Sequence, residues 1–391
     1  MKIKIKQKTS EWFDAVRGFS AIIVLIAHLN QVFNIPIFGL NGFCHLFFGI
    51  LARYAVICFF ILSGFLITMS ILKNITINNR FDSLDFLKKR LIRIYPPYFF
   101  SLLLCVFIYY VVSYFEMHGY NTFRTPDDLY LAREKFSLVP QTYYKAFFIL
   151  HNIIEGYPSS INMNGPLWSI SYEWWLYILA MFFSIWVKNK NYLIGLVSFL
   201  IIMVYLFHTS NYSFIWFSTF WVLGAISAII YSKKLKIKKN IIIPIIISLL
   251  TIVIVYLFND WKILIPRDDN ITFSFQLLIS VLLVLVFSFP LFRYNLFINI
   301  FKKTAKFSYT LYVIHFPIIL ISYSILHVFY QNQNNFTRLL VFLSLCIIII
   351  IISNFLSTFL ENKNIHIAMI KKISNKFKTN INSTAPKNKS K

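Results

Sequence analysis

Charged residues, and acidic ones above all, are scarce in this sequence. Only 13% of its 391 residues are Asp, Glu, Lys or Arg, about half of the ~25% that soluble domains carry. Hydrophobic residues make up 58% of the chain and aromatic residues 19%. This balance excludes a soluble globular protein and predicts an integral membrane protein.

Cysteine is also rare and follows no pattern. The four cysteines show no paired spacing: Cys44, Cys58, Cys105 and Cys346. This argues against a disulfide framework and a zinc site, and we expect no metal cofactor. Basic residues exceed acidic ones by 24. They lie between apolar runs, so we attribute them to membrane topology and expect no nucleic acid partner.

Ten apolar runs are long enough to cross a bilayer. Their approximate limits are 14–33, 47–72, 95–115, 167–187, 192–208, 214–232, 241–258, 271–292, 309–329 and 339–360. The tails and the connections between these runs alternate between the two sides of the membrane. Those on one side hold 29 Lys and Arg residues and those on the other side hold 7. Because the basic side is cytoplasmic, we predict an all-α integral membrane protein with about ten transmembrane helices and both termini cytoplasmic. Its domains are a transmembrane domain over 1–361 and a basic cytoplasmic tail over 362–391.

The first apolar run carries ionisable groups. Asp14 and Arg17 stand at its start, and His28 lies deep inside it, 11 residues after Arg17. This spacing returns to within about 20° of the same helix face, with a rise of about 16 Å. Ionisable groups inside a membrane are expensive and suggest function. The alternative for His28 is a structural imidazole bonded to a backbone carbonyl. No small-residue cleavage site follows the basic N-terminus, so we expect a retained span and not a signal peptide.

Two connections are more than short loops. Leucines at helical spacing over 84–94, with Arg90 and Arg93 among the charges opposite, predict an amphipathic helix on the cytoplasmic surface. Pro96 and Pro97 are expected to end it. The two guanidinium groups suit the phosphates of a soluble cofactor, although such helices also bind anionic lipid headgroups. The outer connection, 116–166, is long enough to form a lid or a docking surface.

Polar residues recur at three further spans. In the second, Ser63 and Gly64 are small enough for close helix approach. Glu173 is the only acidic residue clearly inside the bilayer region; it can pair with Arg53, or orient His28 or a substrate hydroxyl. On the ninth, Tyr312 and His315 share a helix face, with packing as the alternative role. The start of the fourth span supplies further polar side chains: Trp168, Ser169 and Ser171.

Together these segments resemble the acyltransferase 3 family of membrane-bound acyltransferases, from about Asp14 to Glu361. The features that carry the resemblance are Arg17 and His28 with ten residues between them, the run 59–67, Arg90-x-x-Arg93, Trp168-Ser169 through Glu173, and Ser308-Tyr309 through His315. The resemblance implies transfer of an acyl group, commonly acetyl, from cytoplasmic acyl-CoA to a hydroxyl of a cell-surface glycan such as O-antigen, capsule or exopolysaccharide.

The resemblance also implies that Arg17 and His28 are essential and that Arg90 and Arg93 belong to the acyl-CoA site. We expect the pantetheine arm to follow the helix of Arg17, and His28 to take the proton of the acceptor hydroxyl. The assigned catalytic residues are His28, Arg17, Glu173 and Asp14; the cofactor-binding residues are Arg90, Arg93 and Arg17; the substrate-binding residues are Trp168, Ser169, Ser171, Tyr312 and His315.

The expected location is the bacterial cytoplasmic (inner) membrane, as a multi-pass protein. Expected partners are acyl-CoA, a glycan acceptor that includes lipid-linked forms, membrane lipids and a separate extracytoplasmic transferase, since some family members carry an extra hydrolase-like domain. The chief alternative is a transporter or flippase for a glycan or organic anion, because intramembrane charges fit that too. We find neither internal similarity nor paired interrupted spans, which transporters often show. An inactive scaffold would leave Arg17, His28 and Glu173 unexplained.

Overall fold

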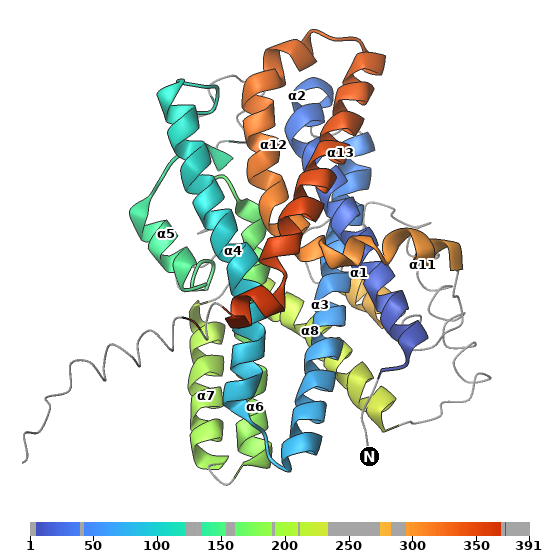
Figure 1. Cartoon of the computed structure of the whole chain (residues 1–391), viewed down its shortest axis with the longest axis vertical. Coiled ribbons are helices and arrows are strands. Elements are labelled where there is room, and N and C mark those ends of the chain that lie inside the picture. The colour runs from blue at the N-terminus through green and yellow to red at the C-terminus, as the bar shows by residue number, and fades with distance from the viewer. Residues whose placement is uncertain are drawn as a thin grey trace, which may run out of the picture.

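A computed structural model describes most of the chain, namely residues 5–39, 43–121, 123, 131, 134–153, 161–189, 192–209, 212–233, 274–282, 295–368 and 372. In these residues the chain is almost entirely helical, with one isolated bridge between Tyr120 and Phe136. The prediction of an all-α protein is confirmed. The elements, shown in Figure 1, are α1 (Gln7–Leu29), η1 (Asn30–Asn34), α2 (Ile35–Phe38), α3 (Phe43–Asn78), α4 (Ser83–Tyr114), α5 (Pro140–Phe147), η3 (Gly165–Leu167), α6 (Trp168–Lys188), α7 (Tyr192–Thr209), α8 (Tyr212–Ser232), α11 (Asn295–Phe301), η5 (Thr304–Lys306), α12 (Ser308–Gln331) and α13 (Asn335–Leu360).

Seven of the described helices are long and apolar enough to cross a membrane: Gln7–Phe38, Leu46–Asn78, Ser83–Tyr114, Gly165–Lys188, Ser213–Ser232, Ser308–Gln331 and Asn335–Ala368. They match seven of the ten predicted runs, and the fifth run is a shorter apolar helix at Tyr192–Tyr205. The predicted run 241–258, and 271–292 apart from 274–282, lie outside the described residues. The chain is a multi-pass membrane protein.

The path of α4 corrects one prediction. Pro96 and Pro97 do not end a surface helix; they lie inside α4, which joins that helix to the third span over 32 residues. A proline removes a backbone donor, but groups on neighbouring helices can satisfy the freed carbonyls of a membrane protein. The carbonyls that lose a donor are those of Ile92 and Arg93, four residues before the prolines; the Tyr309 hydroxyl donates close by, to the carbonyl of Ile94 at 3.1 Å. The predicted surface helix is therefore the first part of a longer helix.

Helices α3 and α8 cross with their backbones in contact. A Cβ on Gly64 would overlap the carbonyl oxygen of Trp221 and lie 2.9 Å from its carbonyl carbon. One on Gly224 would overlap the carbonyl oxygen of Ile61 and lie 2.8 Å from its carbonyl carbon. Small residues allow such an approach, which confirms the prediction for Gly64.

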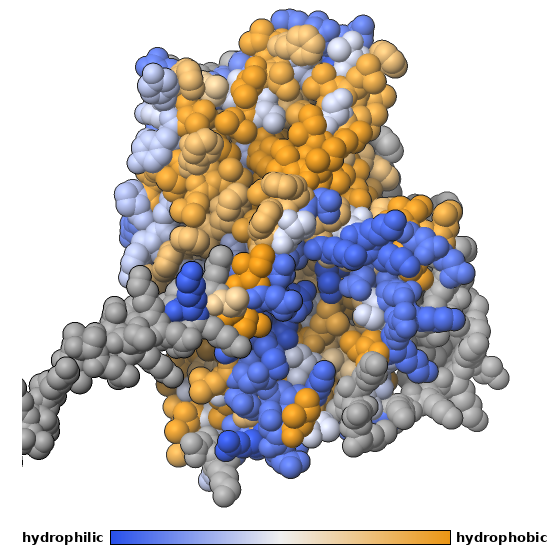
Figure 2. Space-filling view, viewed as in Figure 1, coloured by the Kyte–Doolittle hydropathy of each residue, from blue (hydrophilic) through white to orange (hydrophobic). Residues whose placement is uncertain are grey.

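The surface divides into an apolar and a polar part. Figure 2 shows hydrophobic side chains over α12 and α13 in the upper half of the view, and hydrophilic ones gathered below, over the first turns of α4. On α13, Leu343, Ile347, Ile351 and Phe355 are all exposed large hydrophobic residues. An apolar helix face of this kind fits a lipid environment, because water would disfavour it.

Helix α1 packs between α3 and α12 and also against α11 and η5 (Figure 1). A Cβ on Gly18 would overlap the carbonyl oxygen of Phe301 and lie 2.9 Å from the Cβ of Thr304. This close approach fixes the position of the neighbouring Arg17. The helix is continuous from Gln7 to Leu29, so Arg17 and His28 lie on one helix.

Candidate active site

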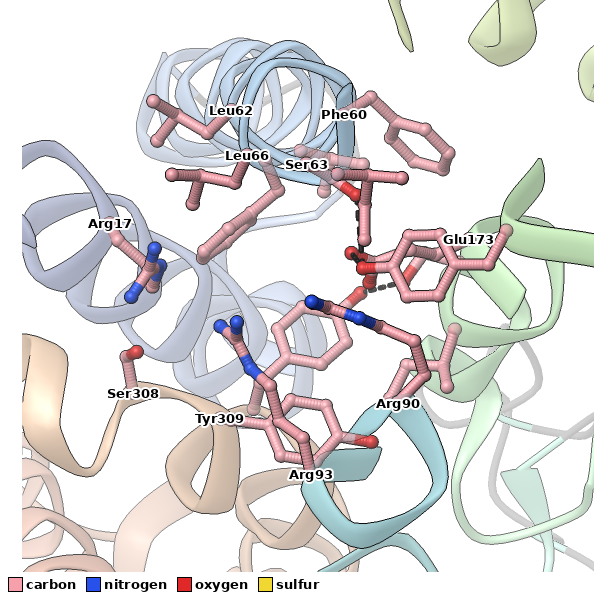
Figure 3. A pocket seen from close by; sticks show the side chains of 17 residues that line it. Arg17, Phe60, Leu62, Ser63, Leu66, Arg90, Arg93, Glu173, Ser308 and Tyr309 are labelled. Carbon is pink, nitrogen blue, oxygen red and sulfur yellow. Dashed lines mark hydrogen bonds between the residues drawn. The ribbon is translucent and has the colours of Figure 1, made fainter. Parts of the chain in front are cut away.

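A pocket between α1, α3, α4, α6 and α12 brings together side chains that are far apart in the sequence (Figure 3). Its apolar wall comes mainly from α3. Its polar lining is Arg17, Ser63, Arg90, Arg93, Ser169, Glu173, Tyr177, Ser308, Tyr309 and Tyr312. The three arginines expected at the donor site therefore share one cavity.

Positive charge dominates one side of this pocket. Figure 3 shows the guanidinium groups of Arg90 and Arg93 side by side and pointing into it, with Arg17 facing them from α1. Arg90 donates to the hydroxyl of Ser70 at 2.8 Å. Arg17 bonds to Asp14, at 3.3 Å between Nη1 and Oδ1. Because three like charges repel one another, the pocket favours an anion that accepts from several guanidinium groups, such as phosphate.

Glu173 supplies negative charge opposite the arginines. Its carboxylate accepts a hydrogen bond from Tyr177, whose hydroxyl oxygen lies 3.1 Å from that of Ser63 (Figure 3). The bonds join α6 to α3 across the pocket. Glu173 lines the same pocket as Arg17 and Arg90. Arg53 is the alternative ion partner predicted for Glu173. Its guanidinium carbon lies 4.8 Å from the centroid of the Phe217 ring.

His28 lies outside the lining of this pocket. Its Nδ1 is 2.9 Å from the Oε1 of Gln31. An amide oxygen only accepts, so Nδ1 carries the proton and Nε2 holds the lone pair of the neutral ring. The centroid of the His28 ring is 5.2 Å from that of His315. Gln31 is thus the hydrogen-bond partner that holds Nδ1 of the His28 ring.

The residues assigned to substrate binding fall into different places. Ser169 and Tyr312 line the pocket, and their hydroxyl oxygens are 2.5 Å apart. Ser171 is fully buried and donates to the carbonyl of His151 at 2.6 Å, which holds α6 against the preceding segment. Trp168 packs among aromatic rings of α3 and α8. His315 lies beside His28.

Sequence reasoning missed Gln31 and Tyr177. Gln31 follows His28 by three residues, and Tyr177 follows Glu173 by four. These are the spacings at which side chains meet on a helix. A systematic search of both spacings around each buried ionisable residue would have found the two partners.

The described part of the predicted outer connection contacts α4. The hydroxyl of Tyr98 donates to the carbonyl of Ala146 at 2.7 Å. His151 is buried, with its Nε2 3.0 Å from the carbonyl oxygen of Leu167. Burial lowers the pKa of His151 to about 4, against the opposing effect of that hydrogen bond, so the ring is neutral at pH 7. This segment is thus joined to the spans by a buried polar network.

The pocket offers two kinds of chemistry. Three guanidinium groups suit a phosphate-bearing ligand, and an imidazole outside the pocket lining, beyond Tyr312, suits the acceptance of a proton. In the part of the chain that the structure describes, no group of three or more His, Cys, Asp or Glu side chains is arranged to hold a metal ion. The residues suit a group transfer from a phosphorylated donor.

Comparisons with known proteins identify the family of this chain. The family described as an acyltransferase domain, acyltransferase 3, matches residues 10–357. O-acetyltransferase OatA from Staphylococcus aureus strains NCTC 8325 / PS 47 and COL is 24% identical over 330 residues, which cover 78% of this chain and 50% of OatA. The chain thus spans about half the length of these curated relatives. No solved structure shows a significant match.

The family match covers every pocket residue from Arg17 to Tyr312. It also includes His28 and His315, and its limits lie three residues from the start of α1 at Gln7 and three residues from the end of α13 at Leu360. The chain belongs to the acyltransferase 3 family of membrane proteins.

Proposed function

We propose that this protein is a membrane-bound O-acyltransferase, and specifically an O-acetyltransferase. It moves the acyl group of cytoplasmic acyl-CoA to a hydroxyl of a cell-surface glycan. The observation that carries the proposal is the convergence of Arg17, Arg90 and Arg93 in one pocket between membrane-spanning helices. The name of OatA, an O-acetyltransferase, supports acetyl as the transferred group.

The donor binds with its phosphates at Arg90 and Arg93 and its pantetheine arm directed past Arg17. Asp14 holds the Arg17 side chain at 3.3 Å. Glu173 and Tyr177 line the wall opposite. The pocket reaches Phe59 and Tyr312, so the thioester end of the donor lies toward the middle of the helices.

His28 is the general base. The Tyr312 ring lies 6.0 Å from that of His315, which lies 5.2 Å from that of His28. The base therefore sits beyond the end of the donor pocket, where an acceptor from the opposite side can meet it. The hydroxyl attacks the thioester carbon as its proton passes to His28 Nε2; the carbon–sulfur bond breaks, and CoA leaves as a thiol with that proton.

The protein has ten spans, with both termini in the cytoplasm of a bacterium and the spans in its inner membrane. This placement rests on the excess of Lys and Arg in one set of connections, 29 against 7. A transmembrane domain over 1–361 precedes a cytoplasmic tail over 362–391. Single cysteines in 116–166 should react with an impermeant maleimide in intact spheroplasts, and those in 233–240 only after lysis. The opposite pattern would refute the topology.

The activity test uses purified protein in lipid nanodiscs. Labelled acetyl-CoA is supplied with extracted O-antigen, capsule or exopolysaccharide, including lipid-linked forms, and released CoA thiol and labelled glycan are measured together. Acyl transfer predicts equal amounts of both. Movement of unmodified glycan across a liposome membrane, with no CoA release, would favour a transporter and contradict the proposal. Acetate release without labelled glycan would refute the glycan acceptor.

A further inference from the structure

The pocket that holds Arg17, Arg90 and Arg93, which we call the arginine pocket, is too small for the whole donor proposed above. Its volume is about 90 Å³, whereas small-molecule sites usually enclose about 300–1,000 Å³. An acyl-CoA consists of an acyl-pantetheine arm, two linked phosphates and an adenosine that carries a 3′-phosphate. With the linked phosphates and the arm in the arginine pocket, no room is left for the adenosine. This part of the donor needs a second space beside the arginines.

A larger cavity, of about 500 Å³, lies next to Arg90 between the last turns of α3 and the start of α4. We call it the α3–α4 cavity. Arg90 lines the arginine pocket, but its side chain donates to the hydroxyl of Ser70 at 2.8 Å, and its guanidinium carbon lies 5.5 Å from the centroid of the Phe86 ring. Ser70 and Phe86 both line the α3–α4 cavity. The two spaces are therefore neighbours, with Arg90 between them.

Hydrogen bonds hold the walls of the α3–α4 cavity in place. The amide nitrogen of the buried Asn74 donates to the carbonyl of Asp82 at 3.1 Å and to the carboxylate of Asp85 at 3.2 Å. Its amide oxygen accepts from the Asp82 N–H at 2.9 Å. The turn between the two helices is tied to the end of α6, because the N–H and carbonyl of Phe81 both bond to the side chain of Asn189, at 3.0 and 2.9 Å. A preformed cavity of this kind lowers the cost of ordering when a ligand binds.

The lining of the α3–α4 cavity suits a nucleoside. The carboxylates of Asp82 and Asp85 line it, and such oxygens accept from amino and hydroxyl groups. Asn78 adds a side-chain amide, a group that pairs with the amino group and ring nitrogen of adenine. Lys89 is bonded to Asp85 at 2.7 Å, whereas the exposed Lys73 forms no ion pair with a described residue. The cavity thus fits adenine and ribose, and Lys73 is left to bind a phosphate.

We propose that the α3–α4 cavity binds the adenosine of the donor acyl-CoA, with the 3′-phosphate at Lys73. This inference rests on the acyltransferase function proposed above. The donor then lies across Arg90, with its adenosine in the larger cavity, its linked phosphates at the arginines and its pantetheine arm in the arginine pocket. Because the adenosine is remote from the reacting bond, its contacts are the same in the ground state and the transition state. They therefore lower KM and leave kcat unchanged.

Filling the cavity tests where the adenosine binds. Ile77 lines the cavity and is 66% exposed, so Ile77→Trp enlarges a side chain that belongs to no core. We expect this variant to bind CoA at least about tenfold more weakly than the wild type, measured by calorimetry in nanodiscs, with an unchanged kcat at saturating acetyl-CoA. Leu84→Trp is the matched control, because Leu84 is 78% exposed at the start of α4 and does not line the cavity. It should bind CoA like the wild type.

A second variant tests the position of the 3′-phosphate. Lys73→Ala should weaken CoA binding by about 3–10-fold, through loss of a hydrogen bond to a charged group. It should leave the binding of 3′-dephospho-CoA unchanged, because that probe lacks the phosphate in question. Lys88→Ala is the control: Lys88 is an exposed lysine on α4 outside the cavity lining, and its loss should change neither affinity.

Wild-type affinity of Ile77→Trp for CoA would overturn this inference and would indicate that the cavity holds something else, such as a lipid headgroup. An equal loss of CoA and 3′-dephospho-CoA binding in Lys73→Ala would overturn the placement of the 3′-phosphate. Either result leaves the proposed function intact, provided that the wild type transfers acetyl groups. A wild type that neither binds CoA nor transfers acetyl groups would instead overturn the proposed function, and this inference with it.

Discussion

Replacing Gly64 with Ala tests the close crossing of α3 and α8. The new Cβ would overlap the Trp221 carbonyl oxygen and lie 2.9 Å from its carbon, and it would meet the backbone nitrogen of Ala225 at 3.1 Å. Carbon atoms pack best at about 3.5–4.0 Å, and these neighbours are backbone atoms, which no side-chain rotation can move. The helices must separate by roughly 1 Å at the crossing, and overpacking of this kind costs about 1–3 kcal/mol.

The assay is thermal unfolding of the purified protein in one detergent. Gly64→Ala and Gly224→Ala should each lower the unfolding temperature, and the double variant should lose less than the sum, because one separation relieves both overlaps. Gly49→Ala, on the same helix with no atom within 4 Å of its added Cβ, is the control. It should be neutral or raise stability, since Ala favours helix over Gly by about 1 kcal/mol. Equal stability of the Gly64 and Gly49 variants would refute the crossing geometry.

Three further predictions concern the pocket and the segment that precedes α6. Replacing both Arg90 and Arg93 with Gln should weaken acetyl-CoA binding, measured by calorimetry, without unfolding the protein. Lys at both positions should restore the binding only partly, because the planar fork is lost. Unchanged affinity of the Gln variant would indicate that both residues bind lipid headgroups instead. Tyr177→Phe removes the donor to Glu173 and should lower stability to unfolding by about 1–3 kcal/mol, and an unfolding curve that overlays the wild type would contradict that bond. In the folded protein the pKa of His151 is about 4, below its ordinary value of 6.5, so its contribution to stability is present above pH 6.5 and lost as pH falls toward 4. His151→Gln should therefore make the unfolding temperature depend less on pH between 6.5 and 4. An unchanged pH profile in this variant would argue against that contribution.

Helical periodicity predicted much of the fold. Seven apolar runs became long helices, and the spacing of Arg17 and His28 correctly placed both on α1. Prolines misled the prediction at α4, because spacing along one chain does not show which neighbouring helices surround the two prolines. Contacts that decide a helix path in a membrane come from its neighbours.

The sequence predicted which residues belong to the candidate site better than it predicted their contacts. The sequence and the family resemblance together indicated Arg17, Arg90 and Arg93 as donor residues, and the structure brings all three to one pocket. The bond between Ser63 and Tyr177, 114 residues apart, depends on which helices are neighbours, and composition and periodicity carry no information on that. The partner of His28, by contrast, was available locally three residues downstream.

The central claim is that His28 takes the proton from the hydroxyl group of the glycan acceptor during acyl transfer. The direct measurement is transfer from acetyl-CoA per folded protein for the wild type, His28→Ala and His28→Gln. A general base contributes roughly 10²–10⁴-fold in rate, and Gln can hydrogen-bond but cannot take a proton at neutral pH, so both variants should fall by that factor while still binding acetyl-CoA. Transfer by His28→Gln within about tenfold of the wild type, below the usual general-base contribution, would contradict the claim.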